Sequence, residues 1–267
     1  MVHKKNFLWG KHYFGHFVGG DLEDTILYSE YFGKPKVLEL ENLSKYDPEL
    51  LQEFITHFIE KKSVRYFLRE LNEIEQVDEI GFMHEQGFKR FSRNYCFEFN
   101  KDLAEYHREP TLICMDAGLD HTRQIRDLDI ASQILEYRDE IYKSKSYLLQ
   151  NLDDIFVFVN PRERSKVLAF AVKRPWQNEN LYRFIIHPSN TDMVEHCIQA
   201  FAEKYIHIEK NLNYRFVINE CHKKLVDKLK DTYQFLSSTQ LLIKEGAPKS
   251  KSKSASTLFA VRKAATS

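Results

Sequence analysis

The stretch LYRFIIHPSNTDMVEHCIQAFA, residues 181–202, holds a strand, a turn and a helix in succession. Residues 181–186 form a short apolar run that ends just before Pro188, which is typical of a buried strand closed by a turn. The polar residues 189–192 can cap a helix, because their side-chain oxygens accept hydrogen bonds from free amides. Apolar side chains then return every three or four residues over 193–208, which predicts an amphipathic helix.

Further strands flank this stretch on both sides. The apolar runs 155–159 and 167–172 are separated by a charged turn and predict an antiparallel hairpin. Residues 215–218 predict a fourth strand, and apolar spacing over 223–236 predicts a second helix before a last strand at 240–243. The second half of the chain therefore has the order β-β-β-α-β-α-β.

The region upstream completes this half. Residues 123–129 predict a short strand, and apolar residues between 130 and 148 recur at helical spacing. With these elements the second half has a full α/β layout over 121–246. Residues 101–120 have no clear period and are predicted to link it to the first half.

The first half repeats the later elements of the second at an offset of about 150 residues. Residues 36–43 resemble the strand at 181–186, and Pro48 falls in the first turn of a helix, where its missing amide has no cost. A helix over 74–86 and a closing strand over 89–99 follow. The repeat predicts an internal duplication.

One pair of segments carries the repeat most directly, because residues 64–71 match residues 214–221, with Glu70 at the place of Glu220. Residues 25–32 are compatible with a strand or a helix, and a first helical layer has no room before them. The predicted organisation is a shortened unit over 1–100, a linker over 101–120, a complete unit over 121–246 and a disordered basic tail over 247–267.

Composition excludes several classes of protein. The chain of 267 residues is 43% hydrophobic, which is ample for a packed core. It has 39 basic and 39 acidic residues, and five of the basic ones lie in the tail from Gly246 onward. The body before that tail is therefore acidic, with a net charge of minus five. Because nucleic-acid affinity comes largely from Lys and Arg, nucleic-acid binding is disfavoured.

The cysteines and histidines predict no metal cofactor. None of the four cysteines shows a metal-ligand spacing, and Cys96 and Cys197 sit in apolar runs, as free core cysteines do. The pair His12 and His16 has no third ligand near it. No run approaches the ~18 apolar residues of a membrane span, and the N-terminus lacks the apolar core of a signal peptide. We therefore expect a cytoplasmic protein without a membrane segment, of undefined oligomeric state.

The order of elements resembles the GNAT superfamily of N-acetyltransferases, in which a mixed sheet splays to admit acyl-CoA. Residues 125–135 resemble the family's opening elements, and Ile186-His187-Pro188 resembles the end of its central strand. Residues 83–88 (MHEQGF) resemble the family's Tyr-x-x-x-Gly-Phe, with 233–238 as the second half's version. The resemblance implies an α/β fold of two GNAT-like units, each a mixed, mostly antiparallel sheet with flanking helices.

The family's pyrophosphate motif, Gln/Arg-x-x-Gly-x-Gly/Ala, is missing from both halves. Glycine is needed there so that phosphate oxygens can approach the amides at a helix start. The corresponding residues 188–194 and 44–49 contain no glycine, and each holds an aspartate. If acyl-CoA is the cofactor, the resemblance implies contacts at Ile186, Pro188, Ser189, Asn190, Thr191 and Met193.

Three residues are candidates for catalysis by that resemblance. Tyr233 stands where the family has a general acid for the departing thiolate, or it is a core tyrosine of its helix. Glu39, on the same strand face as Glu41, stands where some members have a general base, or it belongs to an exposed polar face. His187 ends the central strand and is either a base or a structural residue before proline.

Three functions remain open from the sequence. The first is transfer of an acyl group from a CoA thioester to an amine, in a small molecule or another acceptor, in the second half with Tyr233 as proton donor. The second is a non-catalytic GNAT-fold protein that binds a ligand or partner, which the absence of both phosphate loops favours. The third is a Fem-type transferase that takes aminoacyl-tRNA, which the acidic body disfavours.

Overall fold

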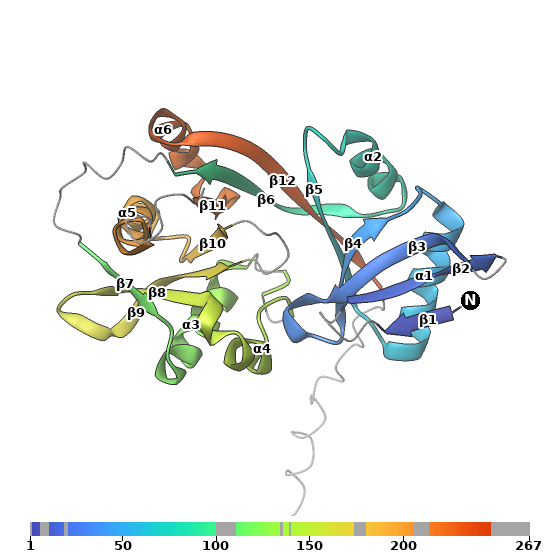
Figure 1. Cartoon of the computed structure of the whole chain (residues 1–267), viewed down its shortest axis with the longest axis horizontal. Coiled ribbons are helices and arrows are strands. Elements are labelled where there is room, and N and C mark those ends of the chain that lie inside the picture. The colour runs from blue at the N-terminus through green and yellow to red at the C-terminus, as the bar shows by residue number, and fades with distance from the viewer. Residues whose placement is uncertain are drawn as a thin grey trace, which may run out of the picture.

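A computed structural model of the chain describes residues 2–5, 11–18, 21–99, 111–133, 136–138, 140–173, 180–205 and 214–246. Within these residues twelve strands form one continuous sheet in the order β1-β2-β3-β4-β5-β12-β6-β11-β10-β9-β8-β7. The first half, residues 2–99, and the second half, residues 111–246, lie at opposite ends of this sheet (Figure 1). The predicted α/β fold class is confirmed.

The first half contains six strands and two α-helices among its described residues. A 3-10 turn, η1 (Tyr31–Gly33), follows the third strand. The strands are β1 (Val2–Lys5), β2 (Lys11–Val18), β3 (Asp21–Glu30), β4 (Val37–Leu43), β5 (Tyr66–Asn72) and β6 (Lys89–Glu98), and the helices are α1 (Pro48–Lys62) and α2 (Val77–Glu85).

The second half repeats this layout and adds two helices between its first two strands, α3 (Thr122–Ser132) and α4 (Lys145–Gln150). The first half has no such helices among its described residues, as its predicted shortening implied. The other elements are β7 (Ile113–Asp116), β8 (Ile155–Asn160), β9 (Glu163–Lys173), β10 (Asn180–Ile186), α5 (Met193–Tyr205), β11 (Tyr214–Asn219), η5 (Glu220–Leu225), α6 (Val226–Thr232) and β12 (Gln234–Glu245).

Strand pairing is the same in both directions from the centre of the sheet. The pairs β4–β5 and β10–β11 are parallel, and every other neighbouring pair is antiparallel. Each parallel pair is joined through one helix, α1 in the first half and α5 in the second. Helix α1 begins as predicted, because the Asp47 carboxylate accepts hydrogen bonds from the amides of Glu49 and Leu50, and Pro48 occupies the first turn.

The two halves exchange their last strands, which the sequence did not predict. Strand β12 pairs with β5, and β6 pairs with β11, so each closing strand lies beside the other half's fifth strand (Figure 1). Leu242 of β12 consequently packs in the first-half core, and Phe97 of β6 packs in the second-half core. The apolar pattern of a strand fixes which face is buried and leaves its neighbour undetermined.

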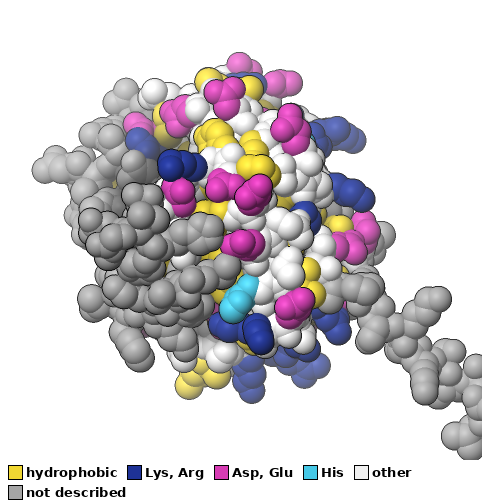
Figure 2. Space-filling view, turned by 90° about the vertical axis from the view of Figure 1, so that its right-hand side faces the viewer, with side chains coloured by type: hydrophobic (Ala, Val, Ile, Leu, Met, Phe, Trp, Pro, Cys, Tyr) yellow, Lys and Arg dark blue, Asp and Glu magenta, His cyan; other side chains and the backbone are white. Residues whose placement is uncertain are grey.

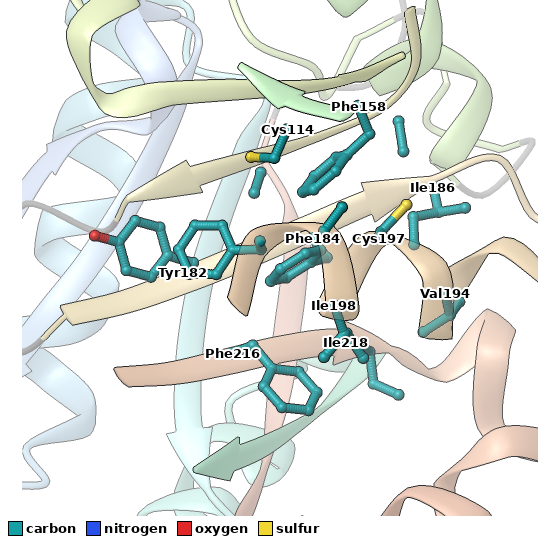
Figure 3. Close-up of a cluster of buried hydrophobic side chains, with 14 of the residues drawn as sticks. Cys114, Phe158, Tyr182, Phe184, Ile186, Val194, Cys197, Ile198, Phe216 and Ile218 are labelled. Carbon is teal, nitrogen blue, oxygen red and sulfur yellow. The ribbon is translucent and has the colours of Figure 1, made fainter. Parts of the chain in front are cut away.

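Helix α5 covers one face of the second-half sheet. Figure 3 shows its side chains Val194, Cys197 and Ile198 in the buried cluster that also contains Phe184 of β10 and Phe216 of β11. The thiol of Cys197 is fully buried, and burial raises its pKa, so this cysteine is part of the core as predicted. The predicted apolar spacing of the helix is therefore borne out over Met193–Tyr205.

Four predicted elements differ from the structure. Residues 123–129 form part of helix α3 and no strand, because Thr122, Ile125 and Asp129 repeat at helical spacing and are all buried. The second helix of this half ends at Thr232, so the last strand begins at Gln234, six residues before the predicted start. Strand β7 lies inside the predicted linker 101–120. For residues 25–32 the strand alternative holds as far as Glu30 in β3, and Tyr31 and Phe32 belong to η1.

Some predictions fall on residues outside the described part of the chain. These are the linker residues 101–110, the end of the predicted helix at 206–208 and the basic tail 247–267. Among the described residues, no helix combines the length and the apolar character needed to cross a membrane.

Candidate functional site

Both parallel strand pairs separate before they end. The pair β4–β5 is in register from Val37 opposite Tyr66 to Leu40 opposite Arg69, and each strand then runs three residues further without the other. The pair β10–β11 stops at Arg183 opposite Val217, although β10 continues to Ile186. Each half therefore contains a gap between two parallel strands, beyond the point where their pairing stops.

An arginine closes the gap of the first half. Arg69 Nη1 donates to the carbonyl oxygens of Leu40, at 3.2 Å, and Glu41, at 2.5 Å. Its Nε and Nη2 both lie 2.7 Å from Glu79 Oε1, and the two side chains are almost fully buried. Gln76 donates to the second oxygen of the same carboxylate. The guanidinium is thus held by two contacts across the gap to β4 and by two contacts with Glu79 of α2.

A histidine closes the gap of the second half. His222 is 2% exposed, and its Nε2 lies 3.3 Å from the carbonyl oxygen of Ile186 at the end of β10. A carbonyl only accepts, so this hydrogen bond places the proton on Nε2 and leaves Nδ1, 3.2 Å from Thr191 Oγ1, without one. The single hydroxyl proton of Thr191 can be directed to Nδ1 or to the carbonyl oxygen of Pro188. Burial lowers the pKa of His222, which favours this neutral form.

A cleft of about 1180 Å³ lies between the two halves. It is on the face of the sheet opposite α1 and α5, since Leu38 and Leu40 pack toward α1 while Glu39 and Glu41 line the cleft. The cleft reaches the open end of the first-half gap, where it touches Leu40, Glu41 and Arg69. It touches only the paired, opposite end of β10–β11.

The floor of the cleft is a hydrogen-bonded cluster around Glu70. Arg183 Nη2 donates to both carboxylate oxygens, at 3.1 and 3.0 Å. Asn94 Nδ2 and Thr239 Oγ1 donate to Oε1, at 3.0 and 2.7 Å. These side chains come from β5, β10, β6 and β12, so the floor is built by both halves.

The ion pair between Glu70 and Arg183 also shows that the sheet is bent. Three strands, β12, β6 and β11, lie between β5 and β10. At a spacing of about 4.8 Å between neighbours, a flat sheet would place these two strands about 19 Å apart. The two side chains can meet only if the sheet bends, so the strands on either side of the cleft face each other.

Two residues on the first-half side of the cleft have acid–base character. Tyr31, the first residue of η1, is 6% exposed and lines the cleft together with Glu39 of β4. Burial raises the pKa of the Tyr31 phenol, Arg183 lowers it, and the charges of Glu39, Asp129 and Glu70 raise it further. The phenol therefore stays protonated and can donate a proton or a hydrogen bond.

The predicted phosphate-binding turn has its amides in use. Asn190 N donates to His187 O at 2.8 Å, Met193 N to Asn190 O at 3.0 Å, and Val194 N to Thr191 O at 3.3 Å. His187 Nδ1 lies 2.7 Å from Ser189 Oγ. The Ile186 side chain points into the core beneath α5 (Figure 3), and Pro188 accepts from the Thr191 hydroxyl. None of these residues lines the cleft.

Tyr233 lies on the other face of the sheet from the cleft. It follows the last residue of α6 and has an extended backbone, with φ −122° and ψ 151°. The expectation that Tyr233 belongs to a helix is therefore wrong. Its ring packs edge-on against Phe216 and Phe99, with centroids 5.1 and 6.0 Å away. The structure brings Glu39 into the cleft and places Tyr233 and the turn at 187–193 elsewhere.

Sequence reasoning missed Tyr31, Arg69 and Arg183. The sequence contains one signal for Arg183, which is the only charged residue in the apolar strand LYRFII. An arginine buried in a sheet requires a partner of opposite charge or a hydrogen-bond acceptor. Its partner, Glu70, is 113 residues away and could not be assigned. The predicted equivalence of Glu70 and Glu220 does not hold, because Glu220 begins η5 and pairs with Arg90.

A second hollow lies on the outward face of α1, around Glu53, His57 and Glu60. Figure 2 looks at this side of the molecule and shows acidic side chains spread across it. All the described residues that line the hollow belong to one helix, so no second element of the described part of the chain forms a wall of it. Within the described residues, no group of three or more His, Cys, Asp or Glu side chains is placed to hold a metal ion.

The sheet order, the splayed parallel pairs and the helix that joins each pair define the fold of the GNAT N-acetyltransferases, present here as two similar halves. Comparison with solved structures bears this out. A tandem GNAT protein from the clavulanic acid biosynthesis pathway superimposes with a TM-score of 0.54 at 10% identity, over 89% of this chain and 83% of that one.

Two further structures share the fold. A GCN5-related N-acetyltransferase from Sphaerobacter thermophilus gives a TM-score of 0.52 at 6% identity, over 86% of this chain and 78% of that one. A putative acetyltransferase from Pyrococcus horikoshii gives a TM-score of 0.54 at 10% identity, over 89% of this chain and 74% of that one. No family model matches the sequence, and no curated protein matches it. The likeness is therefore one of fold.

Proposed function

We propose that the protein is an acyltransferase whose acceptor binds in the cleft between the halves and whose acyl donor, a CoA thioester, approaches through the first-half gap. The observation that carries this proposal is the position of the cleft at the open end of a splayed parallel pair, beside Leu40 and Glu41. In this fold such a gap is where a thioester chain can hydrogen-bond to strand edges. The acetyltransferases with the same fold support the reaction class.

The chemistry needs a base for the acceptor and an acid for the donor. Glu39 takes a proton from an acceptor ammonium, and the free amine attacks the thioester carbonyl carbon. The carbon–sulfur bond breaks as the new amide forms, and Tyr31 gives its proton to the departing thiolate. The second proton that the nitrogen loses on becoming an amide restores the Tyr31 phenol. Both side chains line the cleft, and the raised pKa of Tyr31 keeps that proton in place beforehand.

A donor that enters from the α1 side has to displace Arg69 from the carbonyls of Leu40 and Glu41. Those carbonyls then become available to the donor's amide groups. The site suggested by the sequence, with Tyr233 as acid and the turn at 187–193 as the donor contact, is a second location for the same reaction. There the donor has to displace His222.

Release of free thiol from acetyl-CoA, with a panel of amines, tests the proposal. We expect turnover that falls by about 10²- to 10⁴-fold in Glu39→Gln and in Tyr31→Phe, the usual size of an acid–base contribution. Tyr233→Phe is the matched control and should leave turnover unchanged. Loss of turnover in Tyr233→Phe, with normal turnover in the other two, would move the reaction to the second half.

A second candidate function is ligand binding without catalysis. The observation that favours it is the closure of both gaps, by Arg69 with Glu79 and by His222. A thermal shift experiment separates the two functions, because a ligand stabilises the protein only if it binds the folded state. Stabilisation by acetyl-CoA supports transfer. If acetyl-CoA, a longer acyl-CoA and aminoacyl-tRNA all leave the melting temperature unchanged, the non-catalytic function is favoured.

A further inference from the structure

The charges that line the cleft are segregated by half. The first half contributes five carboxylates, Glu30, Glu39, Glu41, Glu70 and Glu75, and one cation, Arg69, which is paired with Glu79. The second half contributes four cations, Lys143, Lys173, Arg183 and Arg215, and one carboxylate, Asp154. Three of these cations already pair with a carboxylate, Lys143 with Asp129, Arg183 with Glu70 and Arg215 with Glu98. One wall of the cleft is therefore lined mainly by carboxylates and the other mainly by cations.

The bend of the sheet turns these two walls toward each other. The contact between Glu70 and Arg183 is the point on the floor where an acidic and a basic side chain from the two halves already meet. Above it, Glu39 and Glu41 extend from β4 on one side and Lys173 from the end of β9 on the other. Arg183 keeps a buried Nε that makes no hydrogen bond to the described residues.

A ligand with a single charge would face a wall of like charge in this cleft. A ligand with an ammonium at one end and a carboxylate at the other can direct each toward the opposite charge, at the acidic wall and at Lys173 with Arg183. The volume of about 1180 Å³ exceeds the range of about 300–1,000 Å³ typical of small-molecule sites, so it leaves space for a donor thioester as well.

We propose that the ligand of the cleft, and hence the acceptor, is a zwitterion of the α-amino acid type, either free or as a short peptide. This inference rests on the proposed function only where it names the acceptor. Binding itself requires no acyl donor, so the test is made without one.

The test is calorimetric titration of the full chain with the twenty common amino acids and with dipeptides. Each compound that binds is compared with its methyl ester, which lacks the carboxylate, and with its N-acetyl derivative, which lacks the ammonium. We expect both derivatives to bind at least about tenfold more weakly. The amino acid and dipeptide arms distinguish the free from the peptide form.

Variants assign each end of the ligand to its wall. Lys173→Met should weaken binding of the parent compound and leave the methyl ester unaffected. Glu41→Gln should weaken the parent compound and leave the N-acetyl derivative unaffected. Lys61→Met and Glu60→Gln, on the exposed end of α1, are the matched controls and should change neither.

The inference is overturned if no amino acid or dipeptide binds, or if a compound binds as tightly after esterification or acetylation. Its failure is distinguishable from that of the proposed function. Zwitterion binding without any thiol release would refute acyl transfer and leave this inference standing. Transfer to simple amines, without zwitterion binding, would refute the inference and leave acyl transfer standing.

Discussion

Arg69 and His222 each bridge the gap of one half and use different chemistry. Arg69, on β5, donates to the carbonyl oxygens of Leu40 and Glu41, where the pairing with β4 stops, and His222, in η5, donates to that of Ile186 at the end of β10. Arg69 brings a charge and therefore requires Glu79 as a buried partner. His222 needs no counter-ion while it is neutral. This difference leads to a different test for each residue.

Removing the charge of Glu79 should leave the Arg69 guanidinium buried without its partner. We expect Glu79→Gln to lower the free energy of unfolding by about 3–5 kcal/mol, the usual effect of breaking a buried ion pair. Urea unfolding followed by circular dichroism measures this change. Glu85→Gln, on the exposed face of the same helix α2, is the control and should change stability little. Equal effects of the two substitutions would contradict the account of the gap.

His222 should make stability depend on pH. Burial holds its pKa below the value of about 6.5 of an exposed histidine, so the unfolded chain binds more protons than the folded one below that pH. The contribution is complete above about pH 6.5 and is lost as the pH falls from there through the lower pKa of the folded protein. Urea unfolding at a series of pH values measures it.

The controls for this dependence are two glutamine substitutions. His222→Gln keeps a donor for the carbonyl of Ile186 and does not titrate, so its stability should fall less on acidification. His196→Gln removes an exposed histidine of α5 and should keep the full dependence. A pH dependence in His222→Gln as steep as in the original chain would show that another group is responsible.

At the scale of elements, the exchange of β6 and β12 ties each half to the other. Leu242 is fully buried in the first-half core although it belongs to the last strand of the chain. We expect Leu242→Ala to lower the free energy of unfolding by about 2–5 kcal/mol, as large-to-small core substitutions do. Because the strand also pairs with β6, both halves should unfold in one transition.

Urea unfolding followed by far-ultraviolet circular dichroism measures the loss of unfolding free energy and the number of transitions. Leu149→Ala, whose side chain is 43% exposed on α4, is the matched control. A second transition that appears only in Leu242→Ala would contradict the interlocked sheet. The two halves would then unfold independently.

Most elements could be predicted because their burial follows a regular period. Strand β10 and helices α1 and α5 follow such patterns, and the turn before each helix carries capping residues. Helix α3 could not be predicted in this way, because one of its buried positions is Asp129, whose charge interrupts the apolar pattern. Lys143 neutralises that charge, with Nζ 2.9 Å from Oδ1, and lies in a distant segment.

The candidate site was predictable only in part. Alternation along a strand placed Glu39 and Glu41 on one face, and both line the cleft. The remaining groups come together through the strand exchange and the bend of the sheet, which depend on contacts between residues more than 100 positions apart, such as Glu70 with Arg183. A local pattern contains no information about such pairs.

At the scale of the whole molecule, the bent sheet turns two similar halves into one site with different walls. Within the described residues the cleft meets the open end of the first-half gap and the paired end of β10–β11, so the halves contribute differently to it even though their strand order repeats. The proposed donor path follows from this asymmetry. It runs past Arg69 into the cleft, where Glu39 and Tyr31 lie on one side and Lys173 and Arg183 lie on the other.

A crystal structure of the chain with bound acetyl-CoA tests that path most directly. The account predicts the thioester chain beside the carbonyls of Leu40 and Glu41, with the Arg69 side chain displaced and the acetyl group in the cleft. A donor bound along the turn that follows Pro188, with Arg69 still seated between β4 and β5, would contradict it.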